Sequence, residues 1–79
     1  MKEKLNDILY KYWDETLQVN NFNHDRLLKL YNKDLTKLKI YQKEEFDRFL
    51  DNLITALMIG DRVSIGRIIM LLESITEEI

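Results

Sequence analysis

Cysteine is absent from this chain of 79 residues, so no disulfide and no thiolate metal site can hold the fold together. Proline is also absent, and glycine occurs only at Gly60 and Gly66. Strong helix breakers are therefore almost missing, and apolar and polar residues nowhere alternate with the period of two that marks a strand. A chain this short buries only about 60% of the surface that its unfolded form exposes. Its stability must come from helix packing, to which self-association can add.

A strong charge of one sign and a long apolar run are also missing. The net charge of −2 argues against a protein devoted to nucleic acid. The stretch from Asn52 to Gly60, the longest uncharged one in the second half, is too short to cross a bilayer. Asp7 and Asp14 interrupt the N-terminal region, which resembles neither a secretory signal nor an acid-poor transit peptide. We expect a cytoplasmic protein without membrane contact, and the many Ile, Asn, Lys and Tyr residues suit a low-GC bacterium or its phage.

Apolar residues recur at steps of three and four, which is the period of an amphipathic helix. The first run predicts a helix over roughly residues 3–18, and its members are Leu5, Ile8, Leu9, Tyr12, Trp13, Thr16 and Leu17. Two more runs predict a second and a third helix, with the members Leu27, Leu28, Tyr31, Leu35 and Leu38, then Phe46, Phe49, Leu50, Leu53, Ile54 and Leu57. The asparagine-rich stretch 20–23 predicts a loop before the second helix, with Asn23 as its N-cap.

Residues 39–43, between the second and third runs, contain no helix breaker. We favour a tight bend near residues 40–42. The alternative is one helix from His24 to Ile59, which is longer than a typical globular helix and would need a dimer to cover its apolar side.

Gly60 and Asp61 give a sharper signal, because glycine suits the left-handed residue that closes a helix and aspartate caps the next one. A last helix is then expected from about Arg62 to Glu77, with Ile65, Ile68, Ile69, Leu72 and Ile75 facing inward. The chain is predicted to be one all-α domain over residues 1–79, a small helical bundle arranged as antiparallel hairpins. It has either four helices or three with one of them long.

Few residues offer catalytic or metal-binding chemistry. His24 is the single histidine, and its neighbour Asp25 points away from it on a helix. Asp47 and Asp51 are four residues apart and could share a divalent cation with a partner helix, but a di-metal bundle needs a Glu-x-x-His pair from each of two helices. No calcium-loop spacing occurs. We expect no enzymatic activity, no bound metal and no cofactor.

Four basic residues form a stripe at steps of three and four on the predicted second helix, namely Arg26, Lys29, Lys33 and Lys37. Such a stripe could follow the phosphates of a nucleic acid. It is also what the solvated side of an amphipathic helix looks like. Because the second half of the chain is acidic and no aromatic stacking platform accompanies the stripe, we favour the second interpretation.

The last helix is more apolar than one core-facing side requires, which predicts either a central position or a partner that covers it. The first helix shows the same excess. The predicted partner interface consists of Tyr10, Trp13, Leu17, Val63, Arg67, Met70 and Leu71. Gly66, inside the last helix, predicts a close approach of another helix.

We therefore expect a small regulator or adaptor that binds another protein through apolar helix faces and forms a homo-oligomer. Bacteriocin immunity proteins, antitoxins and phage-encoded inhibitors share this size and class, but no motif of the sequence connects it to one of them. Two alternatives remain open. One is a nucleic-acid-associated protein that uses the basic stripe, and the other is a structural subunit of a larger assembly.

Overall fold

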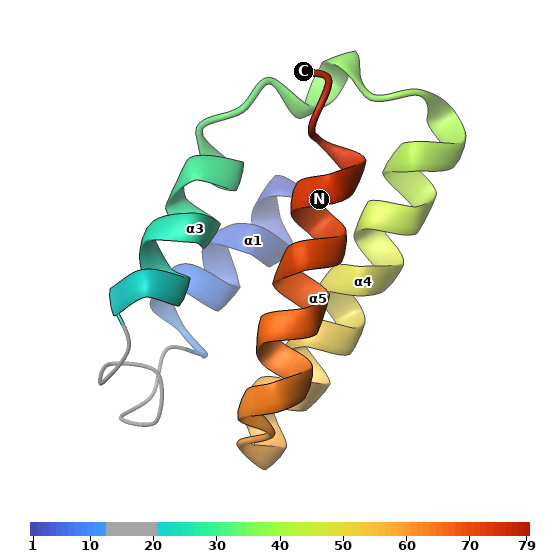
Figure 1. Cartoon of the computed structure of the whole chain (residues 1–79). Helices are drawn as coiled ribbons and strands as arrows, with labels where there is room; N and C mark the ends of the chain where they lie inside the picture. The colour runs from blue at the N-terminus through green and yellow to red at the C-terminus, as the bar shows by residue number, and fades with distance from the viewer. Residues whose placement is uncertain (13–20) are drawn as a thin grey trace.

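The computed structural model describes residues 1–12 and 21–79, and this part of the chain contains four α-helices and no strand (Figure 1). The all-α bundle predicted from the sequence is thereby confirmed. The elements are α1 (Lys2–Tyr10), α3 (Asn21–Tyr31), the short 3₁₀ helix η1 (Leu35–Lys37), α4 (Ile40–Ile59) and α5 (Arg62–Ile75).

The two longest helices, α4 and α5, run side by side in opposite directions (Figure 1). Gly60 closes α4 at φ 72°, and the N–H groups of Gly60 and Asp61 donate to the carbonyls of Leu57 at 3.3 Å and Ala56 at 3.0 Å. This pair of bonds is the usual glycine-dependent helix ending. The Asp61 carboxylate then accepts the backbone N–H of Ser64 at 3.2 Å and its hydroxyl at 2.6 Å, which starts α5. The hairpin predicted at this dipeptide is confirmed.

The connection between α3 and α4 corrects the sequence interpretation. The chain does break, but at residues 32–39 instead of 40–42, and the single long helix is wrong. The Asp34 carboxylate accepts the N–H of Thr36 at 3.2 Å and also its hydroxyl, a local turn that competes with helix formation. Leu35 and Leu38 are nevertheless buried, so the helical spacing of apolar residues continues through the break. For this reason the sequence pattern does not indicate the break.

The N-terminal half also differs from expectation. Helix α1 ends at Tyr10, and the rest of the helix predicted up to residue 18 lies mostly outside the described residues. Asn21 and Asn23 belong to α3, so the N-cap predicted at Asn23 and the loop predicted at residues 21–23 are wrong, while residue 20 of that loop lies outside the described residues. Asn23 is buried, and its amide oxygen accepts a hydrogen bond from Arg26 Nη1 at 3.3 Å. Tertiary packing thus outweighs the low helix propensity of asparagine.

The core lies where all four described helices meet. Helix α5 packs against α4 and α3, while α1 packs against α3 and α4 (Figure 1). The apolar residues at most 4% exposed are Leu5, Ile8, Leu9, Leu27, Leu30, Leu35, Leu38, Phe46, Leu50, Leu53, Ala56, Leu57, Ile65, Ile69 and Leu72. Ile68 and Ile75, also predicted to face inward, are half-buried at the edge of this cluster.

The two glycines should respond oppositely to substitution by alanine. Gly60→Ala forces a Cβ into the left-handed region and should destabilise the fold by about 1 kcal/mol. At Gly66, in the helix interior, an added Cβ would meet nothing within 4 Å, so the predicted close approach of a helix there is wrong. Gly66→Ala should stabilise the fold by about 0.5–1 kcal/mol. Urea denaturation followed by circular dichroism measures both, and equal signs would contradict this account.

Candidate interaction surface

One side of α5 faces away from the core and carries a row of apolar side chains. Val63, Arg67, Met70, Leu71 and Ser74 follow steps of three and four and form what we call the α5 outer face. Val63 is 65% exposed, Met70 62% and Leu71 45%. Four of the seven interface residues predicted from the sequence therefore share one helix face. The neighbouring helices α3 and α4 leave this face uncovered.

Three hollows adjoin the α5 outer face, and two of them are lined by Leu71. A shallow one of about 460 Å³ is lined by Arg67, Met70, Leu71 and Ser74. The second, which we call the α4–α5 groove, measures about 420 Å³ and is lined by Tyr41, Gln42, Glu45, Phe49, Leu71, Ser74, Ile75, Glu77 and Glu78. Leu71 and Ser74 line both, so the groove opens onto the α5 outer face.

The other predicted interface residues lie elsewhere. Tyr10 is 71% exposed at the end of α1, a helix that packs against α3 and α4, so Tyr10 is not part of the α5 outer face. Trp13 and Leu17 lie outside the described residues.

Exposed apolar residues at both ends of α4 were not predicted as interface residues. Met58 and Ile59 are each 73% exposed beside the α4–α5 turn, and Ile40 and Tyr41 are 77% and 61% exposed at the start of the helix. The sequence did contain a signal for the C-terminal end of α4. Leu57, Met58 and Ile59 are three successive apolar residues, which cannot all face one core on a helix.

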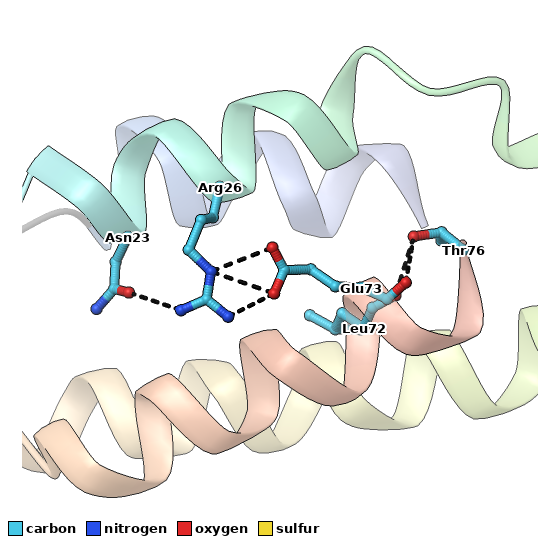
Figure 2. A network of polar contacts seen from close by, with 5 residues as sticks. All are labelled: Asn23, Arg26, Leu72, Glu73 and Thr76. Atoms are coloured by element: carbon cyan, nitrogen blue, oxygen red, sulfur yellow. Dashed lines mark hydrogen bonds and ion pairs between the residues drawn. The ribbon is translucent and has the colours of Figure 1, made fainter.

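The basic stripe contributes to the packing of α3 on α5. Figure 2 shows the Arg26 guanidinium facing the Glu73 carboxylate, with Nε 3.2 Å from Oε1 and 3.1 Å from Oε2, and with Nη2 also bound to Oε1. Lys33 Nζ donates to the carbonyl of Thr76 at 2.7 Å. Two of the four predicted nucleic-acid contacts thus bind groups at the C-terminal part of α5.

Lys29 and Lys37 are exposed, but α3 ends at Tyr31 and Lys37 belongs to η1. The four cations therefore do not share one helix face, and the prediction of a single basic stripe on the second helix is wrong. A hollow of about 440 Å³ beside Lys29 is lined by Arg26, Lys29, Leu30, Lys33, Met70, Glu73, Ser74 and Glu77, so its charges are mixed.

The paired carboxylates of α4 bind a cation from the chain itself. Lys4 Nζ lies 2.9 Å from both Asp47 Oδ2 and Asp51 Oδ1, and these two contacts raise the pKa of Lys4 above its ordinary value. The lysine ammonium thus occupies the place between the carboxylates that a divalent ion would take. Within residues 1–12 and 21–79, no group of three or more His, Asp or Glu side chains has a metal-binding arrangement. His24 is half-buried near the start of α3.

Comparison of the chain with protein-family models, with curated proteins and with solved structures gave no match in any of the three. Among the described helices, none combines the length and the apolar character needed to span a membrane.

The Arg26–Glu73 pair should make the stability depend on pH in acid. The hydrogen bond and charge of Arg26 lower the pKa of Glu73 below its ordinary value of 4.5. The fold therefore favours the ionised carboxylate, and the resulting stabilisation is complete above pH 4.5 and is lost as the pH falls through the lowered pKa. Because Glu73 is 41% exposed, we expect Glu73→Gln to cost no more than about 1 kcal/mol at neutral pH.

The difference between wild type and Glu73→Gln should shrink as the pH falls, which urea denaturation at a series of pH values measures. The stability of both proteins should still fall in acid for another reason. Hydrogen bonds from Thr36 and Ser64 lower the pKa values of Asp34 and Asp61, and these residues are present in both. Glu44→Gln, at an exposed position of α4, is the control and should change little. A difference independent of pH would show that Glu73 contributes packing alone.

Proposed function

We propose that this chain is a non-enzymatic regulator or adaptor that binds protein through the α5 outer face. The observation that carries the proposal is the clustering of Val63, Met70 and Leu71, which are 65%, 62% and 45% exposed on one side of one helix. Single apolar residues on a surface are ordinary, but a contiguous apolar patch with a polar margin is typical of a protein-interaction site.

The residue types on this face support a protein partner. Methionine and arginine are enriched at the centres of protein interfaces, and Met70 and Arg67 lie next to each other here, one turn apart. The face belongs to a helix that the core and the Arg26–Glu73 pair hold in place. Little ordering would then be needed on binding, so the free energy of apolar burial is available for affinity.

Two contacts favour this proposal over a nucleic-acid-binding function. Arg26 and Lys33 are bound to Glu73 and Thr76, which reduces the basic surface offered to a nucleic acid.

Met70→Glu tests the proposal. Because Met70 is 62% exposed, the substitution should change the free energy of unfolding by less than about 0.5 kcal/mol. It should abolish the protein associations of the wild type, since it places a charge at the centre of the apolar patch. Thermal unfolding by circular dichroism measures the first effect, and light scattering together with affinity capture from cell extract measures the second.

Ile69→Glu is the matched control, because Ile69 is the adjacent residue and is fully buried. Burying an unpaired charge costs several kcal/mol, enough to unfold a domain of this size. If Met70→Glu stays folded and keeps every association of the wild type, the α5 outer face is not the binding surface.

A further inference from the structure

We propose that the occupant of the α5 outer face is a second copy of this chain, packed antiparallel along α5 so that Arg67 of each copy enters the α4–α5 groove of the other. This inference rests on the proposed function and names the partner that the face binds.

The charges along the face have a direction that favours self-association. Arg67 lies in the first half of α5, whereas Glu77 and Glu78 follow its C-terminal end. All three side chains are exposed, and none forms an ion pair with another residue of the described part. A two-fold axis perpendicular to α5 places the basic half of each copy against the acidic end of the other. The dimer therefore contains two equivalent contacts between opposite charges. A parallel arrangement would bring like charges together.

The spacing of the residues allows this contact. In an antiparallel pair with Met70 opposite the partner's Leu71, Arg67 lies level with the partner's Ser74. Helical side chains lean toward the N-terminus of their own helix, which for Arg67 is the direction of the partner's C-terminal end. The partner's Glu77 and Glu78 lie three and four residues further on, a distance of about 4.5–6 Å that an arginine side chain can span.

The groove has the chemistry that receives a guanidinium. Glu45, Glu77 and Glu78 line it together with the aromatic rings of Tyr41 and Phe49. Arginine pairs with carboxylates in two-bond geometry and stacks on aromatic faces. Since the groove opens onto the α5 outer face at Leu71 and Ser74, Arg67 would enter it while Met70 and Leu71 of the two copies meet at the centre.

The experiment exchanges the charges at the two ends of the contact. Arg67→Glu is one variant, and Glu77→Arg combined with Glu78→Arg is the other. Each variant alone brings like charges together at both ends of the interface, so its dimer dissociation constant should rise at least about tenfold. In an equimolar mixture of the two variants, both contacts regain opposite charges, one with the signs of the wild type and one with the signs reversed, so a heterodimer of about wild-type affinity should form. Sedimentation equilibrium and native mass spectrometry over a concentration series measure the masses.

Arg62→Glu is the matched control. It makes the same charge change on the same helix, but Arg62 lies about 140° around the helix from Arg67 and is outside the α5 outer face. This variant should dimerise as the wild type does. Circular dichroism should show all variants folded, since their substituted positions are exposed and arginine suits the C-terminal end of a helix.

A wild type that stays monomeric at all concentrations would overturn the inference, as would a dimer that neither charge variant weakens or a mixture that fails to associate. The proposed function fails separately. If the wild type is monomeric but Met70→Glu loses binding to a different protein, the α5 outer face does bind protein, and the identification of its partner as a second copy of this chain is wrong. If Met70→Glu changes no association at all, both proposals are wrong.

Discussion

Helix α5 is apolar over more of its circumference than two neighbouring helices can cover, and the other features of the molecule follow from this. Ile65, Ile69 and Leu72 are fully buried against α4 and α3. Val63 and Met70 belong to the same helix, and steps of three and four put them on the side away from both neighbours. Folding one amphipathic side into the core therefore leaves a second apolar side on the surface, already ordered.

Polar contacts hold α3 in place against α5. Arg26 reaches Glu73 across the contact, and Lys33 donates to the carbonyl of Thr76 (Figure 2 shows the first of these). The Thr76 hydroxyl in turn donates to the Leu72 carbonyl at 3.1 Å. The Leu72 carbonyl also accepts the backbone N–H of Thr76 at 3.2 Å, and the Thr76 carbonyl accepts that of Ile79 at 3.2 Å, so the side-chain bonds give each carbonyl a second donor. Cations that look like a solvated stripe in the sequence thereby orient two helices.

Local signals made the C-terminal half predictable. Gly60 and Asp61 specify the α4–α5 turn through their own backbone and side chain, and the helical period assigned Met70 to the outer side of α5. The break before α4 was misplaced because Leu35 and Leu38 stay buried and so preserve that period. The contact between Arg26 and Glu73 could not be predicted, since 47 residues separate them and only the assembled fold brings them together.

Charge gives the α5 outer face a specificity that its apolar residues lack. Burial of Met70 and Leu71 is favourable against many surfaces and in many registers, because apolar association has no preferred direction. The registers differ in electrostatic energy, because Arg67 lies on one side of these residues and Glu77 on the other. In the proposed dimer, the antiparallel register brings opposite charges together at both ends, while a parallel pairing brings like charges together. Charges that attract in one register and repel in the others give a small apolar patch a preferred partner and orientation.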